Sequence, residues 1–405
     1  MRKVELDSLR GAAAFAVLLW HTTASSLHTF LIGSQFAPVA SPLYNAIMYS
    51  PLRIISAGPE AVWLFFILSG FVLTRSAASP HYRWDAYYPS RIIRLYLPII
   101  AAVLLTALTF VVLPREVTPA NSPFVGGLPN SYSFGLMVRD MTLLNGTSTA
   151  NVPLWSLQWE VLFSILLPLY VLAARALPKT SVVLSVALIV ASAWSDSLVL
   201  LYMPMFLIGS VLGFHWEPIA DRLHIFSSGG TRSTIIGSAA LVAAIFAITS
   251  LYTFNNFIHA QTGVWAYFTN NAFTLLRLAG ICLLLLLALT FPPLRAVLRW
   301  RPFVALGTIS FSLYLTHGPI AIGLAFVMGP GIITTIVQIV ASLAVAIGFY
   351  FAIEKWAHRL ARYVARAIRE RWQGAAVAPH SSAEQNPAYE PVPIAGAGSI
   401  TVGDH

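Results

Sequence analysis

Long apolar runs, separated by short polar segments, dominate the hydropathy pattern of this chain. A helix that crosses a bilayer needs about 20 mostly apolar residues, and ten segments meet or approach that length. They are 11–32, 60–76, 95–113, 154–173, 181–195, 198–214, 234–254, 272–291, 304–327 and 331–352. The pattern therefore predicts an all-α membrane protein, a bundle of about ten transmembrane helices.

The segments between and after these runs predict the remaining organisation. Residues 1–356 form the transmembrane domain, with outer loops at 33–59 and 114–153. Residues 357–373 continue the last helix as a basic amphipathic stretch, which we expect at an anionic membrane surface. From 374 to 405 the sequence is rich in Ala, Pro, Ser and Gly without periodicity, so a disordered cytoplasmic tail is expected.

Composition and charge support this interpretation. The chain is 57% hydrophobic and only 10% charged, whereas soluble domains are about 25% charged. If the N-terminus lies in the cytoplasm, all but four of the 24 Lys and Arg residues fall on the cytoplasmic side. The exceptions are Arg53, Arg115, Arg139 and Arg277. This bias is the positive-inside rule. It predicts that both termini are cytoplasmic, and it explains the net charge of +9 without nucleic acid.

Arg10 and His21 are the most informative pair in the first predicted helix. Eleven helical steps bring His21 back to within roughly 20° of Arg10, about 16 Å further along the same face. Ionisable groups within a bilayer suggest a functional site by default. The simpler alternatives are a topology anchor for Arg10 and a packing hydrogen bond for His21. A cleaved signal peptide is a further alternative, but Glu5 and Asp7 directly before the apolar run argue against it.

Three further charged residues are candidates for the same site. Arg91 and Arg94 share a helix face and can grip a multiply charged anion, unless they serve only as positive-inside markers. Glu160 lies about two turns inside the outer end of its helix. We expect it to meet His21 and fix the imidazole tautomer; the alternative is a hydrogen bond that packs two helices.

Weaker candidates for substrate binding are His317, Tyr314, Arg277 and Ser69. His317 and Tyr314 lie one turn apart in the ninth predicted helix, and Arg277 faces an acceptor or extends its charge to the interface. Ser69, with Gly70, is better explained by close helix packing. No metal-ligand cluster, Gly-rich nucleotide loop or Gly-x-Ser-x-Gly motif appears in the sequence, so no metal is expected.

Together these residues resemble the acyltransferase family 3 membrane proteins, bacterial enzymes typified by sugar O-acetyltransferases. The matching pieces occur in the family's order over residues 3–355. They are Arg-x10-His at Arg10 and His21, Phe-Phe-Ile-Leu-Ser-Gly-Phe at 65–71, Arg-x-x-Arg at Arg91 and Arg94, Leu-Trp-Ser-Leu-x-x-Glu ending at Glu160, and Ile-Ser-Phe-Ser-Leu-Tyr-Leu-x-His ending at His317.

The resemblance implies an acyltransferase of the bacterial inner membrane, acting on groups other than amino-acyl groups. Acyl-CoA, commonly acetyl-CoA, would be its donor substrate rather than a permanently bound cofactor, and a hydroxyl of a saccharide or lipid-linked saccharide its acceptor. CoA is a phosphate-rich cytosolic anion, so we expect Arg10, Arg91 and Arg94 to bind it. His21 would be the general base, oriented by Glu160; a covalent acyl-histidine is the alternative.

A transporter that exports an anionic metabolite is the main competing class, because transporters also place ionisable residues at the middle of the bilayer. The two halves of the chain show no evident internal symmetry and no paired interrupted helices, which counts against it. A transporter would leave the acetyl-CoA thioester intact.

Overall fold

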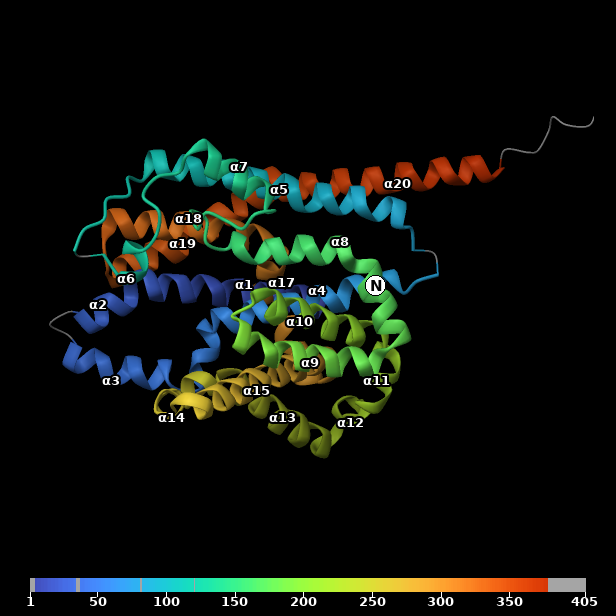
Figure 1. Ribbon diagram of the computed structural model, residues 1–405, viewed down its shortest axis with the longest axis horizontal. Helices are drawn as coiled ribbons and strands as arrows, with labels where there is room; N and C mark the ends of the chain where they lie inside the picture. Colours follow the sequence, from blue (N-terminus) through green and yellow to red (C-terminus); the bar gives the residue numbers. More distant parts are fainter. Residues whose placement is uncertain (1–3, 34–36, 81, 120, 378–405) are drawn as a thin grey trace, which may run out of the picture.

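The computed structural model describes residues 4–33, 37–80, 82–119 and 121–377. Within these ranges every regular element is helical and none is a strand. Figure 1 shows the long helices packed side by side, with most of their axes along the long direction of the molecule. The predicted all-α membrane bundle is confirmed.

Eight helices of the described residues are long and apolar enough to cross a membrane. They are α4 (Gly58–Ala77), α5 (Trp84–Val112), α8 (Leu154–Ala176), α9 (Pro178–Ser195), α13 (Gly230–Thr253), α15 (Gly263–Thr290), α18 (Ser310–Met328) and the run Ile332–Glu370. That run joins α19 (Ile332–Phe349) through the π-helical turn η3 (Tyr350–Glu354) to α20 (Lys355–Val377). A ninth candidate is the pair α10 (Leu198–Phe214) and α11 (Trp216–Arg222), bent by 74°.

The first predicted span lies on α1 (Val4–Thr22), which continues through the π-helical turn η1 (Thr23–Leu27) into α2 (His28–Gly33). Three charged residues, Glu5, Asp7 and Arg10, lie in its first two turns. Helix α1 is therefore not among the eight long apolar spans. With α1 included, all ten predicted segments fall on helices.

Short helices fill the connections. They are α3 (Ala37–Met48), η2 (Pro51–Ser56), α6 (Pro123–Gly126), α7 (Phe134–Thr142), α12 (His224–Ser227), α14 (Asn255–His259), α16 (Pro292–Leu298) and α17 (Arg301–Thr308). Both predicted outer loops therefore contain helical turns. The basic helix α20 extends a few residues past its predicted end at 373, and the rest of the predicted tail, 378–405, lies outside the described residues.

The longer outer loop is organised around Asp140, which is fully buried. Its carboxylate accepts hydrogen bonds from the Tyr132 hydroxyl at 2.8 Å and from the Ser148 backbone N–H and hydroxyl at 2.7 and 2.6 Å. Burial and the neighbouring Asp140 carboxylate raise the pKa of Tyr132. A carboxylate that accepts three hydrogen bonds stabilises this polar connection.

Glycines bring two pairs of helices into backbone contact. A Cβ added at Gly70 of α4 would lie 2.2 Å from the Phe206 carbonyl oxygen, and one at Gly209 of α10 would lie 2.1 Å from the Ile67 carbonyl oxygen. The expected close helix packing at this position is confirmed for Gly70. Likewise, a Cβ at Gly11 of α1 would lie 2.3 Å from the Gly307 nitrogen of α17.

Helix α20 leaves the bundle as a continuation of α19 and packs against α5 (Figure 1). Its far half extends beyond the other helices. The basic stretch predicted for a membrane surface is therefore also attached to the bundle, beside the segment that carries Arg91 and Arg94.

Candidate functional site

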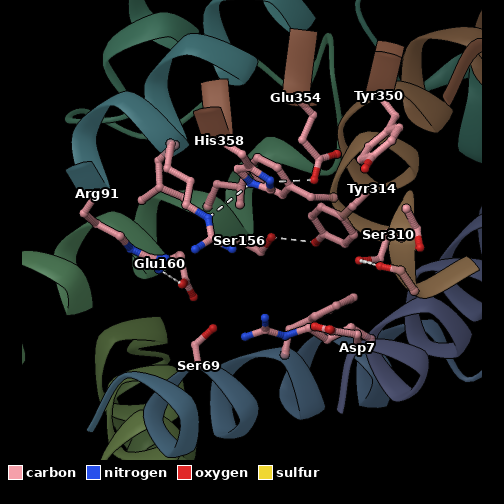
Figure 2. A pocket seen from close by; sticks show the side chains of 18 of the residues that line it. Asp7, Ser69, Arg91, Ser156, Glu160, Ser310, Tyr314, Tyr350, Glu354 and His358 are labelled. Atoms are coloured by element: carbon pink, nitrogen blue, oxygen red, sulfur yellow. Dashed lines mark hydrogen bonds and ion pairs between the residues drawn. The ribbon is translucent and has the colours of Figure 1, made fainter. Parts of the chain in front are cut away.

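A half-enclosed cavity of about 210 Å³ lies among α1, α4, α5, α8, α17, α18 and the start of α20. Figure 2 shows side chains reaching toward it from several of these helices. It offers room for about seven water molecules at their volume in the liquid. Its permanent cations are Arg10, Arg91, Arg94, Lys355 and Arg362, and its carboxylates are Asp7, Glu160 and Glu354. The three arginines predicted to bind a phosphate-rich anion thus lie on one cavity.

An ion pair joins Arg91 of α5 to Glu160 of α8 (Figure 2). The Arg91 Nη2 donates to Glu160 Oε1, and its Nε donates to the Ser164 hydroxyl at 3.0 Å. Each of the two charged side chains is 13% exposed. Glu160 therefore orients Arg91 at the cavity wall and offsets the cost of burying its charge.

Arg94, one turn further along α5, meets α20. Its Nε lies 3.2 Å from His358 Nε2, and the same histidine nitrogen lies 3.8 Å from Glu354 Oε1. The other Glu354 oxygen accepts a hydrogen bond from the Ser312 backbone N–H at 3.0 Å and another from the Ser312 hydroxyl. Sequence reasoning missed Glu354, although a single carboxylate directly after the long uncharged run 332–353 was a usable signal.

Arg10 reaches the cavity because of how α1 is held. The close approach of Gly11 to Gly307 fixes α1 against α17. On the N-terminal side of this contact, Glu5 pairs with Arg295 at 3.0 Å and with Arg299 at 2.8 Å. The N-terminal turns of α1 are thereby fixed in position, with Asp7 and Arg10 at the cavity wall.

His21 and His317 form a buried pair. His317 Nε2 lies 3.2 Å from His21 Nδ1, and the two residues are 0% and 4% exposed respectively. The Nδ1 of His21 lies 3.0 Å from the Val17 carbonyl oxygen, and that of His317 lies 2.8 Å from the Leu313 carbonyl oxygen. The sequence placed both histidines within the membrane, but not in contact.

These contacts define the tautomers. A carbonyl oxygen only accepts, so each Nδ1 carries the proton. His317 Nε2 then has a lone pair that accepts from the His21 Nδ1–H. This leaves His21 Nε2 as an unprotonated nitrogen, buried and without a hydrogen-bond partner. An unprotonated ring nitrogen without a hydrogen-bond partner is available to accept a proton from a bound hydroxyl.

Tyr314 separates the cavity from the histidine pair. It lines the cavity, and its hydroxyl lies 2.6 Å from that of Ser156 (Figure 2). Its ring centroid is 6.0 Å from that of His317, one turn further along α18. The cavity therefore ends at Tyr314, with the histidines directly behind it.

On the side away from the cavity, the histidine pair is covered by aromatic rings. Phe124 of α6 lies 6.0 Å from the His21 ring and 6.0 Å from the Trp20 ring, centroid to centroid. Trp20 contacts His21 edge-on at 4.8 Å. A short helix of the long outer loop therefore closes the site on the side away from the cavity.

The expected contact between His21 and Glu160 is not formed. Glu160 bonds Arg91 instead, and the partner of His21 Nδ1 is His317. The reason is the placement of α18, whose histidine occupies the position beside α1 that the sequence interpretation gave to α8. Ser69 does lie on the cavity.

Arg277 is not on this cavity. Its Nη1 bonds Glu60 at 2.9 Å, its Nη2 donates to the Thr274 hydroxyl at 3.2 Å, and its guanidinium carbon lies 4.6 Å from the Trp63 ring centroid. Sequence analysis did not identify Glu60 as the partner. Among the described residues, no group of three His, Cys, Asp or Glu side chains is arranged to hold a metal ion.

Comparison with known proteins identifies the family. The model of the acyltransferase domain family matches residues 3–355. The chain is 21% identical over 341 residues to the O-acetyltransferase OatA of Staphylococcus aureus strain NCTC 8325 / PS 47, covering 78% of this chain and 50% of that protein. It is 28% identical over 177 residues to the acyltransferase MdmB of Streptomyces mycarofaciens, covering 44% of this chain and 42% of that protein.

The chain thus spans about half the length of the curated relatives it matches. No solved structure matches it. Because the family model covers nearly all of the helical bundle, including the cavity-lining residues up to Lys355 and both histidines, this chain belongs to the acyltransferase family 3 membrane proteins.

Proposed function

We propose that this protein is a membrane-embedded O-acyltransferase that moves an acyl group, preferably acetyl, from acyl-CoA to a hydroxyl of a carbohydrate or glycolipid. One observation carries the proposal: an arginine-lined cavity ends at Tyr314, whose ring lies against His317, and His317 contacts His21, whose Nε2 is buried and unpartnered. Acyl transfer from acyl-CoA to a hydroxyl requires positive charge that binds the CoA phosphates and a general base that takes the hydroxyl proton.

In this proposal the cavity mouth faces the cytoplasm of a bacterial inner membrane, where acyl-CoA is made. Arg10 and Arg94 bind CoA phosphates, since guanidinium groups match phosphate geometry. Arg91, held by Glu160 and Ser164, adds a fixed positive charge at the wall. The thioester end points inward to Tyr314. Rotation of Tyr314 away from Ser156 connects the thioester to the histidine pair.

His21 is the general base. Its Nε2 takes the proton from the acceptor hydroxyl as that oxygen attacks the thioester carbonyl carbon. The carbon–sulfur bond then breaks, and the sulfur leaves with the proton as CoA thiol. His317 orients the ring by accepting from His21 Nδ1–H and stabilises the imidazolium that forms. His317 takes the orienting role that the sequence suggested for Glu160.

The acceptor reaches His21 from the outer side, past Phe124, or laterally from the lipid. That the chain resembles a relative named as an O-acetyltransferase supports a hydroxyl acceptor. A lipid-linked or surface saccharide is the acceptor class that fits a membrane-embedded site with its base covered by an outer loop.

The test is transfer by purified protein in proteoliposomes, with radiolabelled acetyl-CoA and a saccharide acceptor. We expect His21→Ala to reduce transfer at least 1,000-fold, on the order of the cost of losing a general base, while the protein still inserts into the membrane and unfolds cooperatively. His28→Ala is the matched control, because His28 lies on the same helical run but is exposed. A wild-type protein that binds acetyl-CoA and leaves the thioester intact would favour transport and overturn the proposal.

A further inference from the structure

We propose that α20 forms a subsite for the 3′-phosphorylated ADP portion of CoA, with Lys355 and Arg362 as its phosphate-binding cations. The inference rests on the proposed function and specifies how the donor is chosen. The family match ends at residue 355, whereas His358 and Arg362 beyond it still line the cavity. Of the two proposed cations, Lys355 is the last residue of the family match and Arg362 lies beyond it.

One face of α20 is turned to the cavity. Lys355, His358 and Arg362 follow one another at intervals of three and four residues, which places them on the same side of a helix. The contact between Arg94 and His358 at 3.2 Å holds this face beside α5. A different face of α20 exposes Trp356, Leu360 and Tyr363. The basic residues of the cavity face are thus separated from the exposed apolar stripe.

The distribution of charge along the cavity matches the distribution of charge along CoA. Tyr314 lies beside the Ser156 hydroxyl, 2.6 Å from its own, and beside the Phe65 ring, whose centroid is 5.2 Å from that of Tyr314. Toward the α20 end the lining gains Lys355 and Arg362, which add to Arg10 and Arg94. The uncharged pantetheine arm suits the first part, and the diphosphate and 3′-phosphate suit the second.

The length also fits. His317 lies five residues from Ser312, which bonds Glu354, and Arg362 lies eight residues further along α20. At 1.5 Å per residue these steps sum to about 20 Å. A span of this size is on the scale of an extended pantetheine arm, so phosphates at Arg362 allow the thioester to approach the histidine pair.

The subsite predicts a preference for CoA over donors without the nucleotide. The experiment uses the full chain in proteoliposomes and compares acetyl-CoA with acetyl-pantetheine. For the double variant Lys355→Gln/Arg362→Gln we expect the KM for acetyl-CoA to rise about 10- to 100-fold, as for lost charge-assisted contacts. The KM for acetyl-pantetheine should change less than about threefold by the same reasoning. Arg359→Gln is the matched control, an exposed arginine of the same helix that does not line the cavity.

A second readout does not depend on turnover. Adenosine 3′,5′-bisphosphate should raise the thermal unfolding midpoint of wild type and of Arg359→Gln, but not of the double variant. Equal KM increases for both donors, or an equal effect of Arg359→Gln, would overturn the subsite and favour a general membrane-surface role for α20. Nucleotide stabilisation that depends on Arg362, without any acyl transfer by wild type, would keep the subsite and reject the proposed function. Acyl transfer that the double variant leaves unaffected would keep the proposed function and reject the subsite.

Discussion

Two buried arginine–glutamate pairs in this bundle have the same chemistry and different surroundings. Arg277 and Glu60 are 8% and 2% exposed at their side chains, and Tyr252 donates to the second Glu60 oxygen at 2.9 Å. Arg91 and Glu160 are both 13% exposed and line the cavity. The first pair is held by further protein partners, and its Glu60 borders only a smaller cavity of about 110 Å³ with an otherwise apolar lining. The second pair lines the larger cavity, together with several more charged side chains. The presence of an intramembrane ion pair alone therefore does not distinguish a functional site from a structural one.

The largest expected effect is on stability at the Arg277–Glu60 pair. Arg277→Gln should lower the free energy of unfolding by about 3–5 kcal/mol, because it leaves the Glu60 carboxylate buried without its counter-charge. Adding Glu60→Gln should recover much of the loss, since no charge then stays unpaired. Denaturant unfolding in mixed micelles, followed by tryptophan fluorescence, measures both. If Arg277→Gln instead loses transfer at unchanged stability, Arg277 has the acceptor-binding role considered from the sequence.

Substitution in the cavity-lining pair, Arg91 and Glu160, should mainly affect activity. Arg91→Gln is expected to reduce acyl transfer from acetyl-CoA about 100-fold, because it removes a positioned cation and leaves Glu160 as a negative charge facing an anionic donor. The loss of stability should be smaller than for Arg277→Gln. Arg83→Gln is the control, since that arginine precedes α5 and pairs locally with Asp85. Normal acyl transfer by Arg91→Gln would show that the Arg91–Glu160 pair, like the Arg277–Glu60 pair, has only a structural role.

The smallest expected effect comes from removing the Tyr252 hydrogen bond to Glu60. Tyr252→Phe should lower the free energy of unfolding by about 1.5 kcal/mol, the loss of one hydrogen bond to a charged acceptor. Tyr267→Phe is the matched comparison, because its hydroxyl donates to the neutral Val190 carbonyl; it should cost about 1 kcal/mol or less. Acyl transfer by both variants should stay within about twofold of wild type. A Tyr252→Phe variant as stable as wild type would show that water satisfies Glu60.

Several predictions from the sequence survive because they depend on local spacing. Arg91 and Arg94 share a helix face and both line the cavity. Ser69 and Gly70 lie where two helices touch, and Tyr314 sits one turn from His317. Periodicity of 3.6 residues fixes such relations whatever the rest of the bundle does. Contacts between residues of separate helices follow no such rule. The sequence predicted Glu160 as the partner of His21, but the partner in the structure is His317.

The sequence alone determined the class, the helices and the kinds of side chain at the site. Apolar runs of bilayer length leave helices as the natural way to satisfy the backbone, and each intramembrane charge is expensive enough to be conspicuous. Only the tertiary structure decided that Arg91 meets Glu160, Glu60 meets Arg277 and His21 meets His317. Each pair joins helices far apart in sequence. Which helices become neighbours depends on close contacts such as Gly11 against Gly307, and a single sequence does not reveal these by its pattern of residues.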